Sequence, residues 1–219
     1  MSRQPGVVER RSPFAGPVVA TGSSCDCRTG LAEDRGALEG PSTMADPHAF
    51  HTPRSSYAKD DLILSGQGGY FGPGNAQLPA PPMLMMDRIT ELSLDGGEFG
   101  KGHVVAELDI VPDLWFFDCH FPGDPVMPGC LGLDAMWQVL GYWLGWSGSP
   151  GKGRALGVGE VRFRGDVTPA TRMVRYEVSV RQARRGQLAL GVANGRLFAD
   201  DACVYVASGL RVGMIRPAS

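Results

Sequence analysis

The amino-acid sequence predicts an α+β fold in which one long helix is buried against an antiparallel β-sheet. Residues 129–146 (GCLGLDAMWQVLGYWLGW) are apolar on nearly every side and do not alternate, which is typical of a buried helix. Several other segments alternate between apolar and polar residues, which is the period of a strand with one buried face. Strands with one polar face and short connections favour antiparallel pairing.

The other elements follow from the same patterns, in chain order. Residues 58–65 (AKDDLILS) predict a short helix, and Gly- and Pro-rich turns then lead to an apolar segment at 83–89. The first alternating strand covers residues 103–111, before the long helix. Later strands are expected at 160–164, 174–180, 187–193 and 202–207, with a further candidate at 209–214.

The chain divides into two regions of different composition. Residues 1–55 are rich in Gly, Ser, Pro and Arg and contain few aromatic residues. Such a segment cannot bury enough apolar surface to offset its ordering entropy, so we expect a disordered N-terminal extension. Residues 56–219 are expected to form the globular domain. Met44 is an alternative start, in which case residues 1–43 would be an over-extended reading frame.

The composition argues against several classes of protein. A formal net charge of −2 does not favour a nucleic-acid-binding protein, which usually carries a basic surplus. The five cysteines fit neither a disulfide framework nor a zinc-binding pattern, which favours a reducing cytoplasm and no metal site. The apolar stretch at 129–146 contains Asp134 and Gln138 near its centre. Because such side chains are costly in lipid, we expect a core helix rather than a membrane span.

Asp134 is a candidate functional residue because it is the only charged residue between Asp124 and Lys152. A buried carboxylate is unfavourable unless it is paired or neutralised, and acids in such positions are often functional. Asp134, Gln138 and Tyr142 are spaced four residues apart and share one face of the predicted helix. The alternative is a structural aspartate that bonds to a backbone group.

His120 is the second candidate, in the segment WFFDCHFPGDPVMPGC. The Pro- and Gly-rich loop after it opens directly into the long helix, whose first turn offers unpaired N–H groups and the positive end of the helix dipole. These groups can polarise a thioester carbonyl, which acidifies the neighbouring C–H bond. A base, an oxyanion donor and an acid would then lie between residues 120 and 134. A histidine in an apolar segment is also often an inert core residue.

Three runs of sequence carry a resemblance to a known family: LPAPPMLMMDRI, DLWFFDCHFPGDPVMPGCLGLDAMWQ and GKGRALGVGEVRF. The chain closely resembles the bacterial 3-hydroxydecanoyl-acyl-carrier-protein dehydratase/isomerase family over roughly residues 56–215. The central run is long, ungapped and rich in rare residues, which makes the resemblance specific. It implies a homodimer of hot-dog subunits, each with a long central helix wrapped by an antiparallel sheet.

The resemblance also implies roles for particular residues. The family's catalytic histidine falls on His120 and its catalytic aspartate on Asp134, and each active site takes these two residues from different subunits. Gly129 falls where a backbone N–H holds the thioester carbonyl, and Val126 falls where a backbone carbonyl orients the histidine. Dehydratases without isomerase activity typically have Glu at the position of Asp134, so the Asp favours the bifunctional enzyme.

Some residues depart from the family pattern. Asp118 and Pro122 differ from the residues common beside the histidine, but neither falls on a matched catalytic position. The basic turn at 181–186 also has no close match. Its use in docking an acidic acyl carrier protein is therefore an open hypothesis, with a solvated sheet face as the alternative.

The function implied by the resemblance is dehydration of a medium-chain (3R)-3-hydroxyacyl group, carried on the phosphopantetheine of acyl carrier protein, to the trans-2-enoyl product. Isomerisation of the trans-2- to the cis-3-decenoyl group would feed unsaturated fatty-acid synthesis in the cytoplasm. No metal or nucleotide is expected, because this elimination needs only acid, base and carbonyl polarisation. The expected partners are acyl carrier protein and a second copy of the chain, without nucleic acid or membrane. The alternatives are a dehydratase without isomerase activity, a hot-dog thioesterase and a non-catalytic acyl-thioester-binding module.

Overall fold

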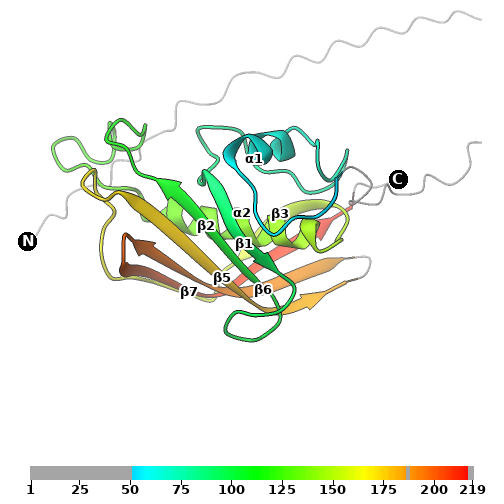
Figure 1. Ribbon diagram of the computed structural model, residues 1–219. Coiled ribbons are helices and arrows are strands. Elements are labelled where there is room, and N and C mark those ends of the chain that lie inside the picture. Colours follow the sequence, from blue (N-terminus) through cyan, green and yellow to red (C-terminus); the bar gives the residue numbers. More distant parts are fainter. Residues whose placement is uncertain (1–50, 186–187, 217–219) are drawn as a thin grey trace, which may run out of the picture. The chain divides into compact units, whose positions relative to one another are not determined.

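A computed structural model describes residues 51–185 and 188–216, in which a seven-stranded sheet packs around one long helix (Figure 1). The helices are α1 (Lys59–Gly66) and α2 (Gly129–Trp146). The strands are β1 (Arg88–Ser93), β2 (His103–Asp109), β3 (Lys152–Gly157), β4 (Glu160–Phe163), β5 (Met173–Arg184), β6 (Ala189–Ala199) and β7 (Ala202–Ile215). The expected disorder of residues 1–50 and the alternative start at Met44 lie outside the described residues.

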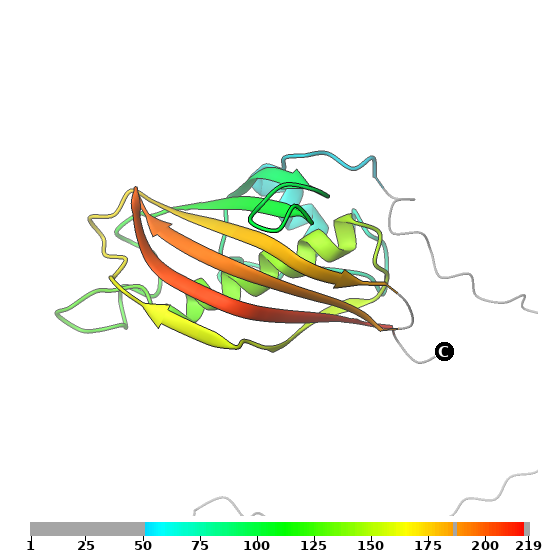
Figure 2. The same ribbon diagram turned by 90° about the horizontal axis from the view of Figure 1, so that it is seen from below.

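The sheet confirms the antiparallel arrangement that the alternating segments predict. The strands are hydrogen-bonded in the order β1-β2-β5-β6-β7-β3, and β4 pairs with β7 farther along that strand. All of these pairs are antiparallel. Helix α2 lies across one face of the sheet (Figure 2). The alternating residues of β5 that belong to the core are fully buried, namely Val174, Tyr176, Val178 and Val180.

Helix α2 begins and ends at the predicted residues. Most of its large side chains, such as Met136, Leu140 and Leu144, are fully buried. One stripe of the helix is only partly buried or is exposed: Cys130, Leu133, Asp134, Trp137, Gln138 and Gly141. The expectation that the helix is buried on all sides is wrong for this stripe.

Within residues 51–185 and 188–216, no helix is long and apolar enough to cross a membrane.

Several strands differ from the sequence prediction: β1 and β3 are absent from it, and β5, β6 and β7 run beyond the expected segments. Strand β7 continues through residues 207–210, where the sequence suggests a break between two strands. Gly209, with φ of +67°, takes part in a bulge at this point, and its N–H donates to Asn194 Oδ1 at 3.2 Å. Strand β3 was not expected, because its residues KGRALG do not alternate and lie along an exposed edge of the sheet.

The segment just before the expected domain boundary also packs on the folded part. The Trp146 indole N–H donates to the Arg54 carbonyl at 2.9 Å, and the Arg54 guanidinium pairs with Asp61 of α1 at 2.8 Å. The His51 ring stacks on Tyr70 with their centroids 4.5 Å apart. Packed structure is therefore present from His51, five residues earlier than the boundary that composition suggests.

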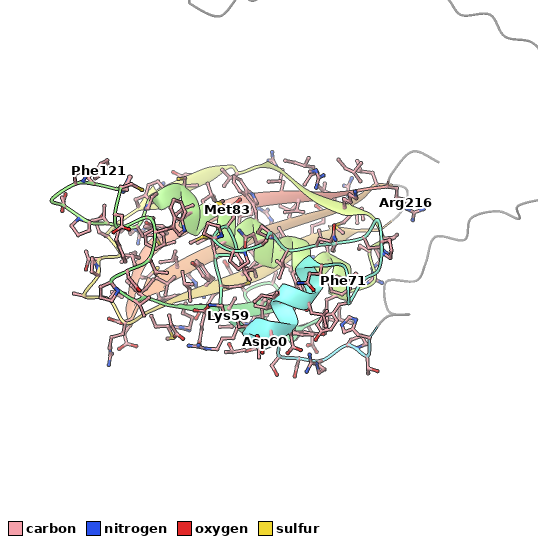
Figure 3. The ribbon with its side chains drawn as sticks, turned by 90° about the horizontal axis from the view of Figure 1, so that it is seen from above. Lys59, Asp60, Phe71, Met83, Phe121 and Arg216 are labelled. Carbon is pink, nitrogen blue, oxygen red and sulfur yellow. The ribbon has the colours of Figure 1, made fainter. Side chains whose placement is uncertain are left out.

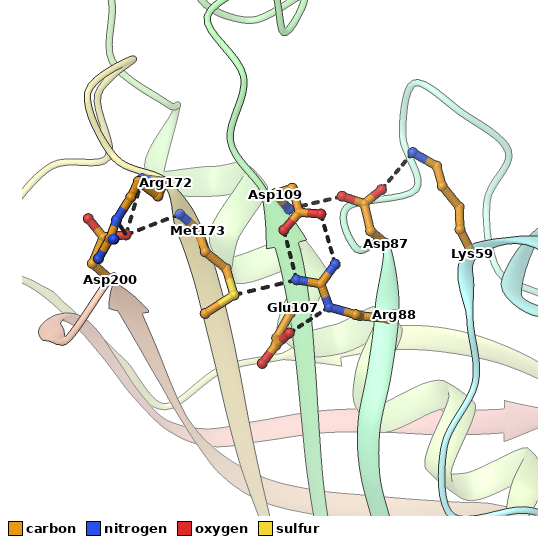
Figure 4. Close-up of polar contacts among 8 residues, drawn as sticks. All are labelled: Lys59, Asp87, Arg88, Glu107, Asp109, Arg172, Met173 and Asp200. Atoms are coloured by element: carbon orange, nitrogen blue, oxygen red, sulfur yellow. Dashed lines mark hydrogen bonds and ion pairs between the residues drawn. The ribbon is translucent and has the colours of Figure 1, made fainter.

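A network of charged side chains ties β1 to the end of β2 (Figure 4). The Arg88 guanidinium donates to Glu107 at 2.6 Å and to both carboxylate oxygens of Asp109, at 2.7 and 2.8 Å. Asp87 accepts the Asp109 backbone N–H at 2.9 Å and pairs with Lys59 of α1 at 2.6 Å. These contacts hold the point at which the chain leaves the sheet for the long loop that precedes α2.

Candidate active site

The loop between β2 and α2 carries His120 and turns back sharply just after it. Phe121 and Asp124 exchange two backbone hydrogen bonds of 2.9 Å across this turn. Gly123 occupies the turn with φ of +83°, a left-handed conformation that favours glycine. Beyond the turn, the Met127 N–H donates to the Val167 carbonyl at 2.8 Å. The loop therefore returns directly to the core before α2 begins.

The His120 imidazole is held by two contacts. Its Nδ1 lies 2.9 Å from the Val126 carbonyl oxygen, and the Val126 N–H donates to the His120 carbonyl at 2.8 Å. The Phe121 ring stacks on the imidazole with their centroids 3.8 Å apart. Since a carbonyl oxygen can only accept, Nδ1 carries the hydrogen in the neutral ring. Nε2 is then left with its lone pair, which is the state required of a general base.

Gly129 is the first residue of α2, so its N–H belongs to the turn whose donors have no partner inside the helix. A Cβ atom at Gly129 would lie only 2.7 Å from Cε1 of Phe163 on β4. The glycine therefore lets the Phe163 ring pack directly on the start of the helix. His120, Val126 and Gly129 all line one cavity of about 580 Å³, so the structure brings these three predicted residues together.

Phe163 and Tyr205 line the same cavity, and sequence reasoning did not single them out. Their rings meet edge to face with centroids 4.8 Å apart. Burial raises the pKa of the Tyr205 phenol from its ordinary value of 10 to about 12. Both residues belong to strands that are far from the loop in sequence. The alternation in the sequence predicts these strands, but it does not indicate that they pack beside His120.

Asp134 lies apart from these residues. Its side chain is partly buried and lines a second cavity, of about 230 Å³, together with Trp137, Tyr142 and strand β3. Neither His120 nor Gly129 lines this second cavity. Within the described residues of this chain, the structure therefore does not join the predicted base and the predicted acid in one cavity.

Gln138 is the immediate polar partner of Asp134. The Gln138 side-chain N–H donates to Asp134 Oδ2 at 2.6 Å and also to the Met83 carbonyl at 2.8 Å. The Gln138 Oε1 accepts the Met85 N–H at 3.2 Å. Figure 3 shows Met83 over α2 and Phe121 at one end of the fold. The spacing of four residues placed Gln138 beside Asp134 in the sequence, but its contacts to the 83–85 segment could not be foreseen.

The arrangement has the parts needed to remove a proton next to a carbonyl group. His120 supplies an oriented lone pair, and the start of α2 supplies an N–H and the positive end of the helix dipole in the same cavity. Asp134, fixed by Gln138, supplies an acid at the edge of a different, largely apolar cavity.

Comparisons with solved structures find low-level similarity to other proteins. The dehydratase heterocomplex ApeI:P from Xenorhabdus doucetiae is 16% identical, with 64% of this chain and 87% of that chain covered and a TM-score of 0.45. AziG of S. sahachiroi is 15% identical, covering 59% and 90%, with a TM-score of 0.41. A variant of the fluoroacetyl-CoA-specific thioesterase FlK is 12% identical, covering 55% and 88%, with a TM-score of 0.40.

The family comparison is more informative. Residues 78–208, more than half of the chain, match the FabA-like domain family, and this range includes the His120 loop, α2 and most of the residues that line the two cavities. The sheet order and the long helix across its face are those of a hot-dog fold. The chain therefore belongs to the FabA-like domain family of hot-dog proteins.

Proposed function

We propose that the protein dehydrates medium-chain 3-hydroxyacyl thioesters and isomerises the trans-2 product to the cis-3 isomer, with the acyl group carried on acyl carrier protein. The observation that carries this proposal is the arrangement of His120, tied through Nδ1 to Val126, in the same cavity as the first N–H of α2. Membership of the FabA-like family supports the same reaction class.

In the proposed dehydration, His120 Nε2 removes a proton from C2 of the substrate. The thioester oxygen gains charge as the C2–H bond breaks, and the Gly129 N–H with the helix dipole stabilises that charge. The electron pair then forms the C2–C3 double bond while the C3 hydroxyl leaves. Asp134 protonates the departing hydroxyl, so that it leaves as water. The proton on His120 returns to the acid before the next turnover.

The acid in this scheme comes from a second copy of the chain. His120 and Asp134 line different cavities of one subunit, so a partner must bring them together. An apolar edge suited to such a partner is present. Strand β3 lies at the edge of the sheet, and Leu156 of β3 and Phe163 of β4 are 52% and 56% exposed. Exposed edge strands are templates for pairing with another chain, so we assign this edge to a homodimer interface.

The isomerisation uses the same groups without loss of water. One group removes a proton from C4 of the trans-2 product and the other delivers a proton to C2, which moves the double bond to C3. The acyl chain fits the cavity beside Asp134, whose wall contains Ala76, Leu78, Pro79 and Trp137.

A basic surface near the end of β5 suits an acidic carrier protein. It consists of the exposed residues Arg181, Arg184 and Arg185.

The test is a turnover assay with 3-hydroxydecanoyl thioester in which chromatography follows the trans-2 and cis-3 products. Both products are expected. The trans-2 product alone would restrict the protein to dehydration. Release of free thiol without an enoyl product would identify a thioesterase, and binding without any reaction would identify an acyl-thioester-binding module. His120→Ala should abolish both products while the circular dichroism spectrum stays unchanged.

A further inference from the structure

The Tyr205 side chain is held in a fixed position against the start of α2. Tyr205 lies opposite Phe163 in the pairing of β7 with β4, so both side chains project from the same face of the sheet. Phe163 is 56% exposed, whereas Tyr205 is only 3% exposed. A Cβ atom at Gly132 would lie 2.6 Å from Tyr205 Cε2 and 2.9 Å from Cδ2, so any side chain there would have to displace the ring. The helix therefore carries a glycine where the ring of Tyr205 needs room.

The hydroxyl at the end of this ring is unpaired. In the part of the chain that the structure describes, it has no hydrogen-bond partner, and it is not sealed from solvent. The hydroxyl of Tyr176 on β5 is also unpaired, but that residue is fully buried. A buried tyrosine usually finds a partner for its hydroxyl, and a phenylalanine would fill the same space without the cost of desolvation. A hydroxyl that is fixed, unpaired and accessible is available to a ligand.

The hydroxyl faces the cavity that contains His120. Tyr205 lines this cavity of about 580 Å³. Burial raises the pKa of its phenol, and the next causes are the charges that Asp166 and Cys130 carry when ionised. Both of these residues line the same cavity. Because interactions between charges weaken with distance, they place the phenol oxygen on the cavity side of the ring.

Strong side-chain donors are few in this cavity. Besides Tyr205, the described residues that line it include two other side chains able to donate, His120 and Cys130. His120 Nδ1 is committed to the Val126 carbonyl at 2.9 Å and its Nε2 is the proposed base, while a thiol is only a weak donor. Ionised Asp166 can only accept. The Tyr205 hydroxyl is therefore the strong donor that this cavity keeps uncommitted.

We propose that the Tyr205 hydroxyl donates a hydrogen bond to the thioester oxygen of the substrate, alongside the N–H of Gly129. This inference rests on the proposed function and adds a catalytic residue to its site. A carbonyl oxygen has two lone pairs, so one backbone N–H leaves room for a second donor. Gly132, against which the Tyr205 ring packs, follows Gly129 by three residues, so the ring lies on the face of the helix that also carries Gly129.

The proposed role is electrostatic. The thioester oxygen gains negative charge when His120 removes the proton from C2, and a donor that is already in place stabilises this charge without having to reorient. The hydroxyl keeps its own proton throughout, so the proton transfers of His120 and Asp134 are unchanged. The hydrogen bond is stronger in the transition state than in the bound substrate, which means that its loss should appear in kcat rather than in KM.

The test compares the full-length wild type with Tyr205→Phe in turnover of 3-hydroxydecanoyl thioester. The variant keeps the ring and removes only the donor, so kcat should fall about a hundredfold, as for other donors to an oxyanion, with little change in KM. The melting temperature should not fall, because the described fold loses no hydrogen bond. An unchanged kcat would overturn the inference. A reduced kcat accompanied by a clear fall in melting temperature would also overturn it, because the hydroxyl would then support the fold.

Tyr176→Phe is the matched control. It removes an unpaired hydroxyl from a buried ring that lines neither the His120 cavity nor the Asp134 cavity, so kcat should equal that of the wild type. A loss of kcat as large as that of Tyr205→Phe would assign the effect to packing of the sheet and overturn the inference. Easier dissociation of the Tyr205→Phe dimer in light scattering would assign the hydroxyl to a contact with the partner subunit, which overturns it as well.

A readout without turnover separates this inference from the proposed function. A saturated decanoyl thioester has no C3 hydroxyl and cannot be dehydrated, and isotopic labelling of its carbonyl carbon makes the stretching band visible in infrared difference spectra. Hydrogen bonds to the oxygen move this band to lower frequency. The shift in the wild type should be smaller in Tyr205→Phe and intact in Tyr176→Phe.

The two proposals then fail in different ways. A wild type that shifts the carbonyl band but forms no enoyl product would contradict the proposed function, while a reduced shift in Tyr205→Phe would still support the hydroxyl as a donor to the thioester. Identical bands in the wild type and Tyr205→Phe would overturn the inference, even if the wild type formed both the trans-2 and the cis-3 product.

Discussion

Gln138 donates a hydrogen bond of 2.6 Å to Asp134 from one helical turn farther along α2. The same amide group donates to the Met83 carbonyl and accepts the Met85 N–H, so its orientation is fixed by backbone groups on a different segment. Oδ2 of the carboxyl group is thereby held, while Oδ1 accepts no hydrogen bond from the part of the chain that the structure describes. Gln138 acts as a positioning residue for the proposed acid.

Replacing Gln138 by Ala should lower kcat about tenfold to a hundredfold, because a small displacement of a reacting group has effects of this size. Gln138→Glu keeps the shape of the side chain but places a second carboxyl group beside Asp134. Like charges disfavour ionisation, so the pH–rate profile of this variant should move to higher pH. Steady-state kinetics across pH would check both variants. A Glu variant with the wild-type profile and a reduced melting temperature would reduce Gln138 to a structural role.

The separation of His120 and Asp134 into two cavities predicts complementation between subunits. His120→Ala and Asp134→Ala should each be nearly inactive, since general acid or base groups typically contribute a factor of about 100 or more. Co-expression of the two variants should restore about a quarter of wild-type activity, because random pairing in a two-fold dimer leaves one intact site in half of the dimers. Separately purified variants mixed without exchange of subunits are the control. Co-expressed protein as inactive as the two variants would contradict a shared site.

Gly129 and Phe163 should show a steric dependence on each other. A methyl group at Gly129 would lie 2.7 Å from Cε1 of the Phe163 ring, so the ring must shift to make room for it. Gly129→Ala should therefore lower kcat/KM about tenfold to a hundredfold by moving the ring within the His120 cavity, with little change in stability. In a Phe163→Ala background the ring is absent, so adding Gly129→Ala should lower kcat/KM much less than it does in the wild type. An equally impaired double variant would show that the methyl group acts on the N–H itself.

The sequence predicted the helix at 129–146 to the residue because an apolar stretch of this length, bounded by Pro128 and by a Ser- and Gly-rich turn, has few alternatives. It also predicted most of the antiparallel strands, since alternation reports directly which face of a strand is buried. Strand β3 was missed because an exposed edge does not require alternation. Strand β1 was missed because a bulge between Ile89 and Glu91 interrupts its alternation of buried residues. The break expected near Gly209 was wrong because the glycine forms a bulge and the strand continues.

For the candidate site, the sequence identified the residues on the loop and helix but not those that complete their surroundings. Phe163 and Tyr205 reach the His120 cavity only because β4 and β7 pair beside α2, and tertiary pairing of this kind is not visible in a local pattern. The separation of Asp134 from His120 also depends on packing. The roles expected for His120, Asp134, Gly129 and Val126 remain predictions for the experiments above.

The last prediction concerns stability at low pH. Two hydrogen bonds from the Arg88 guanidinium lower the pKa of Asp109 below its ordinary value of 3.8 (Figure 4). A carboxyl group with a lower pKa in the folded protein stabilises the fold fully at pH values above its unfolded pKa. That contribution is lost as the pH falls through the folded pKa. Because the Asp109 side chain is 54% exposed, the effect should not exceed about 1 kcal/mol.

Asp109→Asn should therefore be slightly less stable than the wild type at neutral pH, and the difference should shrink as the pH falls below about 4. Urea unfolding at a series of pH values would measure it, with Asp113→Asn, at an exposed position in the following loop, as the control. Because Asp109 ends the strand from which the His120 loop departs, the same variant should also raise the rate of hydrogen exchange in residues 110–128. A stability difference that stayed constant from neutral to acid pH would assign the effect to lost packing rather than to the ion pair.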